Sequence, residues 1–140
     1  MLRQALHEVT VATRGRGFYA FTDEVQSLVE KSRMRMGVVT LLLRHTSASL
    51  LIPENADPEV RRDLERFFTR LIPDGDELFR HTSEGDDDMP AHVRTALTAV
   101  SLAIPFENGS LVLGTWQGIY LWEHRVHPHR RQISVHVLGE

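Results

Sequence analysis

The chain has 140 residues, of which 41% are hydrophobic and 25% are charged, and it contains no cysteine. This composition is typical of one folded domain over residues 1–140, and it excludes disulfides and thiolate metal sites. A formal net charge of -3 with all eight histidines neutral argues against a dedicated nucleic-acid binder, whose affinity depends on neutralising phosphates. Residues 1–11 lack the long apolar run of a signal peptide or membrane span, so we expect a cytoplasmic protein without a membrane partner.

Hydrophobic periodicity and turn residues predict about six strands and three helices. In chain order, the predicted elements are a strand at 6–11, a helix from 22 to about 37, strands at 38–43 and 49–52, helices at 58–71 and 91–100, and strands at 102–106, 111–123 and 132–138. Because hairpins join most of the strands and helices are few, we expect an α+β fold with a largely antiparallel sheet.

Three details of these elements rest on particular residues. Thr22 is the expected N-cap of the first helix, because its hydroxyl can accept a backbone N–H bond. The run 38–43 is apolar throughout and rich in β-branched residues, which predicts a strand covered on both faces. Gly114 and Gly118 within the long strand 111–123 indicate bends or a close approach of other backbone.

Three histidines lie at ends of predicted elements: His45 follows a strand, and His81 and His92 flank the acidic stretch 84–88. Imidazoles supplemented by carboxylates are the ligands that a divalent transition metal needs when thiolates are absent. We therefore interpret these histidines as metal ligands or active-site groups, although their spacing matches no compact ligand motif. The alternative is that each histidine is an ordinary surface group and that the acidic stretch is a solvated loop.

The segment from Glu54 to Asp57 precedes the second helix, which begins at Pro58. A structural explanation has Asp57 capping the helix and Asn55 shaping the turn. Glu54 is not needed for either role, which makes it a candidate general base or metal contact.

Two glycines enclose Trp116 and Gln117 in the segment 114–118, which is a poor composition for an ordinary strand. One interpretation is that a ligand or a second subunit approaches the glycine backbone, with Trp116 as an aromatic wall and Gln117 as a hydrogen-bonding arm. The other interpretation is a bulged strand with Trp116 in the core.

Strand alternation places Glu123 on the same face as Ile119 and Leu121. If that face is buried, the carboxylate needs a histidine, an arginine or a metal as partner. A small basic cluster follows, made of Arg125, His127, His129, Arg130 and Arg131. It fits an anionic substrate such as a phosphate ester, and the alternative is a surface loop that neutralises the acidic stretch.

Four motifs and one further acid stand in order along the chain: HTSA at 45–48, ENAD at 54–57, GDDDMPAH at 85–92, GTWQGI at 114–119, and Glu123. With them the chain resembles the YjbQ-like family, which is often labelled secondary thiamine-phosphate synthase, over essentially its whole length. The resemblance implies a compact α+β fold with a β-sandwich-like sheet arrangement, a homotrimer, a transferase activity, and a metal-associated pocket lined by histidines.

The resemblance also carries over residue by residue. His45 matches the histidine of the family's H-T-[ST]-A element, and His81 and His92 match the histidines before and at the close of its acidic loop. The remaining matches are Glu54, Asn55 and Asp57 in its E-N-x-D element, Trp116 and Gln117 in its G-T-W-Q signature, and Arg131 as the basic residue before the final strand.

Our first hypothesis is a metal-assisted enzyme that acts on a small phosphorylated metabolite, with thiamine-phosphate synthesis as the implied reaction. The expected cofactor is a divalent metal, Zn or Mg/Mn, held by His45, His81 and His92. The expected catalytic residues are His45, His92, Glu54 and Glu123, and the expected substrate contacts are Asn55, Asp57, Trp116, Gln117 and Arg131. The alternatives are a metal-dependent hydrolase and a non-enzymatic metal-binding or regulatory protein.

Overall fold

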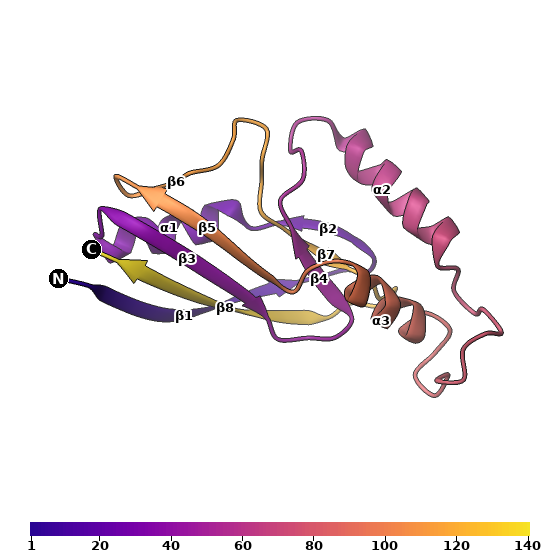
Figure 1. Cartoon of the computed structure of the whole chain (residues 1–140). Coiled ribbons are helices and arrows are strands. Elements are labelled where there is room, and N and C mark those ends of the chain that lie inside the picture. The colour runs from indigo at the N-terminus through magenta and orange to yellow at the C-terminus, as the bar shows by residue number, and fades with distance from the viewer.

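The computed structural model describes all 140 residues as three helices and eight strands in two antiparallel sheets (Figure 1). The five-stranded sheet has the order β1 (Arg3–Ala12), β8 (Arg130–Gly139), β3 (Met36–Leu43), β5 (Ser101–Glu107) and β6 (Ser110–Leu111). The three-stranded sheet has the order β2 (Gly17–Ala20), β7 (Tyr120–Glu123) and β4 (Ala48–Leu51). The helices are α1 (Thr22–Ser32), α2 (Pro58–Leu71) and α3 (Asp88–Leu97). The predicted α+β class with antiparallel sheets is confirmed.

The core lies between the inner face of the five-stranded sheet, helix α1 and the three-stranded sheet. In Figure 1, α1 runs behind the large sheet, while α2 and α3 lie at the end where the two sheets meet. Alternate residues of β3 and β8 point inward, so Val39, Leu41, Ile133 and Val135 are fully buried. The long β1–β8 and β3–β8 ladders make this sheet the rigid frame on which the site is built.

Strand β3 is covered on one face only, which corrects the prediction of two covered faces. Leu41 is fully buried, whereas the neighbouring Leu42 is 48% exposed. No other element of this chain packs on the outer face of the sheet. A continuous apolar run carries no period that distinguishes one covered face from two, which is why the pattern was misleading here.

Helix α1 begins without the predicted cap. Phe21 occupies the N-cap position with no side-chain cap, and the Thr22 hydroxyl instead accepts the backbone N–H of Ile119 at 2.8 Å. The helix ends at Ser32, where Arg33 adopts a left-handed φ of 57°, so Gly37 lies in β3 and not at the end of the helix. A tertiary contact with the three-stranded sheet has taken the hydroxyl that a local cap needs.

The predicted strand 111–123 is two strands in different sheets. The chain leaves the large sheet after β6, crosses to the other sheet and enters it at Tyr120. Gly118 lies in this crossing, and a Cβ there would stand 3.0 Å from the Tyr120 ring and 3.2 Å from the Asn55 Cβ. The atoms that approach Gly118 closely are side-chain atoms, and not the other backbone that the sequence led us to expect.

Helix α2 begins as predicted, because the Asp57 carboxylate accepts the Glu59 N–H at 2.9 Å and Pro58 opens the first turn. Helix α3 begins earlier than predicted, at Asp88, since proline is tolerated in the first turn of a helix and Pro90 continues it. This start places Asp88 on the same element as His92. None of the helices is long and apolar enough to cross a membrane.

Candidate functional site

The acidic stretch and the first turn of α3 bring His81, Asp88 and His92 together. The His81 Nε2 lies 2.9 Å from the Asp88 Oδ2, and the His92 Nε2 lies 3.4 Å from the same oxygen. Asp88 and His92 are four residues apart on α3 and therefore share one helix face. One nitrogen or oxygen atom from each of the three residues lies within 4.8 Å of the other two.

This group fits a divalent cation by the chemistry of its donors. Two imidazole nitrogens and one carboxylate oxygen are ligands that Zn and Mn accept, and a catalytic centre keeps a further position open. The Asp88 side chain is 2% exposed, whereas those of His81 and His92 are 49% and 32% exposed. The carboxylate is thus anchored inside the protein while the imidazoles face solvent, where a substrate can reach an ion.

Arg125, just beyond β7, ties the acidic stretch to the three-stranded sheet. Its Nε donates to the Asp87 Oδ2 and its NH1 to the Asp88 Oδ1, both at 2.9 Å, and its NH2 donates to the Glu84 carbonyl at 2.8 Å. The Val126 N–H adds a bond to the Asp87 carboxylate. Asp87 and Asp88 are consequently buried, so the solvated-loop interpretation is wrong for these two residues.

These contacts keep both carboxylates ionised. Burial alone raises the pKa of Asp88, but the hydrogen bond from His81 and the charge of Arg125 outweigh burial and hold that pKa below its usual value. Burial likewise raises the pKa of Asp87, and the Arg125 hydrogen bond reverses the direction. An ionised carboxylate is the form that a metal requires.

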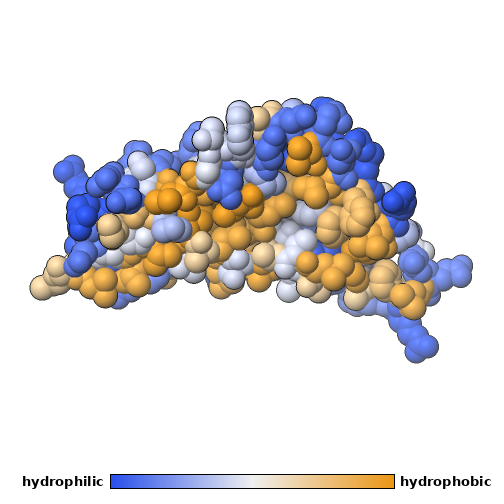
Figure 2. Space-filling view, turned by 45° about the horizontal axis from the view of Figure 1, so that its top comes forward, coloured by the Kyte–Doolittle hydropathy of each residue, from blue (hydrophilic) through white to orange (hydrophobic).

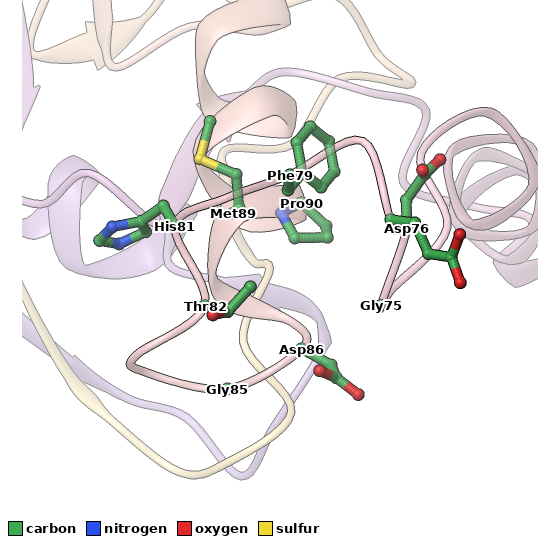
Figure 3. A pocket seen from close by; sticks show the side chains of 10 residues that line it. Gly75, Asp76, Phe79, His81, Thr82, Gly85, Asp86, Met89 and Pro90 are labelled. Atoms are coloured by element: carbon green, nitrogen blue, oxygen red, sulfur yellow. The ribbon is translucent and has the colours of Figure 1, made fainter.

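A small cavity of about 130 Å³ opens beside His81. Figure 3 shows Phe79, Met89 and Pro90 close together, with His81 on one side, Asp76 on the opposite side and Asp86 below them. The full lining is Gly75, Asp76, Glu77, Phe79, His81, Thr82, Gly85, Asp86, Met89 and Pro90. The apolar walls and the polar rim give a small molecule a recess next to the group formed by His81, Asp88 and His92.

Glu123 forms the centre of a second cluster, and its partner is Arg131. The Glu123 Oε1 accepts bonds from the Thr13 hydroxyl at 2.7 Å and from the Arg131 Nε at 2.9 Å, while its Oε2 pairs with the Arg131 NH2. The Arg131 NH2 also donates to the carbonyl and the hydroxyl of Ser47. Only the Arg131 NH1 remains to meet a phosphate, so the guanidinium is mainly a structural counter-ion.

His45 belongs to this second cluster. Its Nε2 accepts the backbone N–H of Gln132 at 2.9 Å, and its Nδ1 lies 3.4 Å from the Arg131 NH1. Burial and the neighbouring Arg131 charge lower the pKa of His45, so the ring is neutral near pH 7. Of the three predicted ligands, the structure brings His81 and His92 together and places His45 with Arg131 and Glu123.

Glu54, Asn55, Asp57, Trp116 and Gln117 lie together at the other end of the three-stranded sheet. Ala48 pairs with Glu123 at one end of β4 and Leu51 pairs with Tyr120 at the other, so the segments that follow β4 and precede β7 meet away from Glu123. There the Asn55 N–H donates to the Trp116 carbonyl at 2.8 Å.

Local backbone bonds occupy several of these side chains. The Glu54 carboxylate accepts the Asp57 N–H at 2.8 Å, which corrects the expectation that Glu54 has no structural role. The Gln117 side-chain oxygen accepts the Gly114 N–H at 2.7 Å. Trp116 is 62% exposed and does not enter the core, so its indole is available for contact with a ligand or a second subunit.

Sequence reasoning missed the importance of Asp88, Arg125 and Thr13. Asp88 is one acid in a run of like charges, and it lies beside His92 only because α3 starts at Asp88. Arg125 belongs to the basic cluster that the alternative interpretation paired with the acidic stretch, and the pairing with Asp87 and Asp88 agrees with that alternative. Thr13 carried no signal, since it meets Glu123 across 110 positions of sequence.

His124 lies between Glu123 and Arg125 and is fully buried. Its Nε2 lies 2.8 Å from the Ser49 hydroxyl, and its Nδ1 has no hydrogen-bond partner. Burial, together with the charges of Arg94, Arg16 and Arg131, lowers the pKa of His124 to about 3. This histidine is therefore a neutral core residue that no substrate reaches.

Comparison with known proteins gives full-length matches. The family described as "UPF0047 protein YjbQ-like" matches residues 7–140. A UPF0047 protein of Synechocystis is 51% identical over 99% of this chain and 94% of the relative, and the UPF0047 protein YjbQ of Escherichia coli is 45% identical over 94% and 96%.

Solved structures agree in fold. A YjbQ/UPF0047 family protein of Clostridium acetobutylicum has a TM-score of 0.86 with 34% identity and covers 94% of this chain and 98% of its own. A protein of unknown function from Sulfolobus solfataricus has a TM-score of 0.90 with 24% identity over the full length of both chains and supports the fold alone. The motifs, the fold and the sequence identity over nearly the whole chain agree, and the chain therefore belongs to the YjbQ-like UPF0047 family.

Proposed function

We propose that this protein is a cytoplasmic, metal-dependent enzyme that acts on a small phosphorylated metabolite. The observation that carries the proposal is the group formed by His81, Asp88 and His92, whose ligand atoms lie within 4.8 Å of one another at the edge of a cavity. A divalent cation held there supplies a Lewis acid that screens the negative charge of a phosphate group.

The second cluster supplies groups that suit the rest of such a substrate. Because the His45 Nε2 accepts a backbone N–H, a neutral His45 carries its proton on Nδ1. That N–H and the remaining NH1 of Arg131 are neighbouring donors for a phosphate oxygen. Glu123 holds the Arg131 guanidinium in place, and because both of its oxygens already accept hydrogen bonds, we assign it a positioning role and not that of a base.

The reaction that the family resemblance implies is thiamine-phosphate synthesis, a transfer in which diphosphate leaves. A metal-dependent hydrolase uses the same centre, so an assay must compare the two. Trp116 and the Glu54–Asp57 turn contribute to the site only if a second subunit brings them near His81, since within one chain they lie beyond the far end of the three-stranded sheet.

The first experiment measures metal and turnover in the same preparations. Purified protein is analysed for bound elements and then assayed for thiamine phosphate formation and against a panel of phosphate esters, with wild type, Asp88→Asn and His92→Ala. We expect bound divalent metal in wild type and the loss of both metal and turnover in the two variants. His127→Ala, which removes an exposed histidine outside both clusters, is the matched control and retains both properties.

Two results contradict the proposal. Wild-type protein that contains no metal, and gains no thermal stability from Zn, Mn, Ni or Mg salts, removes the metal centre. Metal binding without turnover on any substrate instead supports the non-enzymatic metal-binding alternative.

We also propose a homotrimer. The number of three subunits is what the family resemblance implies, and the outer face of the large sheet, where Leu6 is 72% exposed and Leu42 is 48% exposed, is a surface that another copy can cover. Figure 2 shows hydrophobic side chains across the middle of the visible surface and again at the end that carries α2 and α3. Exposed apolar patches of this kind mark subunit interfaces. Light scattering is expected to give three times the 16.0 kDa chain mass, and a monomer mass contradicts the trimer.

A further inference from the structure

We propose that Arg125 is a positioning residue of the metal centre: its guanidinium orients the Asp88 carboxylate so that one oxygen faces the cation between His81 and His92. The inference rests on the proposed function and adds a residue that touches neither the cation nor the substrate. It gives a reason for the burial of an arginine at the start of the β7–β8 connection.

The two oxygens of Asp88 have separate partners. Oδ1 accepts the Arg125 NH1 at 2.9 Å, and Oδ2 lies 2.9 Å from the His81 Nε2 and 3.4 Å from the His92 Nε2. Turning the carboxylate plane away from this orientation breaks the arginine bond, and a half-turn only exchanges two equivalent oxygens. Arg125 therefore fixes the plane in which one oxygen bonds to the guanidinium and the other faces the histidines, and such outer partners orient a metal ligand.

Arg125 is itself held at three points, because each of its guanidinium nitrogens has a different acceptor in the acidic stretch. Besides Asp88, these acceptors are the Asp87 carboxylate and the Glu84 carbonyl. The planar fork of an arginine matches such an arrangement, whereas the ammonium group of lysine is a single point donor. The Arg125 side chain is 14% exposed, so water competes weakly for these bonds.

The backbone of Arg125 contacts the second cluster. Its N–H donates to the Glu123 Oε2 at 3.2 Å, and that carboxylate holds Arg131 beside His45. One residue thus connects Asp88, through its side chain, with Glu123, through its main chain. The orientation of the metal ligands and the placement of the proposed phosphate donors therefore depend on the same short segment.

Arg16 offers a matched control. It forms a bidentate pair with one carboxylate, that of Asp74, at 2.9 and 3.0 Å, and like Arg125 it also donates to a backbone carbonyl, that of His124. Its side chain is 15% exposed, against 14% for Arg125. The two arginines thus have similar burial and similar bonds, but only Arg125 contacts a proposed metal ligand.

The test is a metal titration of chelator-treated protein, with wild type, Arg125→Gln, Arg125→Lys and Arg16→Gln. Zn affinity is measured by competition with a chromophoric chelator, and coordination is followed in the visible spectrum of bound Co²⁺. We expect Arg125→Gln to bind Zn about 10- to 100-fold more weakly, as losses of such outer partners do. Its Co²⁺ spectrum should differ from that of wild type, because the carboxylate no longer faces the ion in a fixed orientation.

Arg125→Lys should recover part of the affinity, since it retains the charge but not the fork, and Arg16→Gln should bind as wild type does. If Arg125→Gln fails to fold by circular dichroism, the lysine variant decides. Wild-type affinity and spectrum in the Arg125 variants overturn the positioning role alone, as does an equal loss in Arg16→Gln. Wild-type protein that binds neither Zn nor Co²⁺ overturns the metal centre and the role of Arg125 together.

Discussion

Asp88 and Glu123 are two nearly inaccessible carboxylates, and Arg125 bonds to both of them. They differ in the groups that bond to their oxygens. Both oxygens of Glu123 are bonded to Thr13, Arg131 or the Arg125 main chain. Asp88 bonds to Arg125 through one oxygen and turns the other toward two histidines that remain accessible to solvent. Burial alone therefore does not separate a structural acid from a candidate ligand, whereas the bonds do: both oxygens of Glu123 accept bonds from fixed donors, and one oxygen of Asp88 faces only histidines.

Because of this difference, loss of each carboxylate should affect a different property of the protein. Removal of the Glu123 charge leaves the Arg131 charge buried without a partner, which is a cost to folding. Removal of the Asp88 charge takes a ligand from the proposed cation, which is a cost to metal binding. Stability and metal response should thus separate when the two acids are changed one at a time.

The largest expected effect is on stability. Glu123→Gln should lower the free energy of unfolding by about 3–5 kcal/mol, because it breaks a buried ion pair from one side. Urea denaturation measures the change. Glu8→Gln is the control, since the pair of Glu8 with Arg44 is 46–55% exposed and should contribute no more than about 1 kcal/mol. Equal effects of the two substitutions contradict the structural role of Glu123.

The second effect concerns the metal response. At a free Zn concentration of about 100 times Kd, bound metal should raise the free energy of unfolding of wild type by about 2.7 kcal/mol. Asp88→Asn should lose this increment, while Glu123→Gln should retain it on a lower baseline. Thermal shifts with and without Zn measure both. A full Zn response in Asp88→Asn removes Asp88 from the centre.

The third effect is pH dependence from His124, the buried histidine that follows Glu123. The unfolded chain binds a proton at this histidine below its ordinary pKa of 6.5, and the folded chain does so only near 3. The contribution of His124 to the free energy of unfolding should therefore be fully present above pH 6.5. It should decrease as the pH falls from 6.5 toward 3, by about 2 kcal/mol at pH 5.

Urea midpoints of metal-free protein between pH 7 and pH 5 test this dependence. His124→Gln removes the titrating group and should flatten the profile, and His7→Gln, a change on the large sheet, should not. An unchanged slope in His124→Gln shows that other groups cause the acid sensitivity.

The smallest effect is expected at the far end of the three-stranded sheet. Trp116→Ala should change the free energy of unfolding by no more than about 0.5 kcal/mol, because the indole is 62% exposed. If this end meets a substrate or a second subunit, the same variant should raise KM or lower the trimer mass. Unchanged values for both assign Trp116 to neither role.

Much of the frame was predictable from the chain. The helix over 58–71, its Asp57 cap and the α+β class follow from local rules, namely helical spacing, a side-chain cap and strands joined by hairpins. Glu123 was predictable as an acid in need of a partner, because strand alternation is also local. The full-length family resemblance likewise depended on motifs that are continuous in sequence.

The convergence of groups was not predictable in the same way. Three histidines at element ends looked equivalent, but His81 and His92 meet Asp88, while His45 is drawn to the Gln132 N–H. Thr22 would have capped α1 had its hydroxyl not met Ile119 across the fold. In each case the side chain bonds to a group distant in sequence, and the periodicity of a local segment does not predict such a partner.

The sequence by itself determined helix α2, the antiparallel α+β class, the family, and the absence of any thiolate ligand. The tertiary structure alone decided which of the acids and histidines stand together, that Glu123 is neutralised by Arg131, and that Arg125 joins the two clusters. The physical reason is that hydrophobic patterning dictates which face of an element is buried, whereas the partners of buried charges are set by how those faces finally pack.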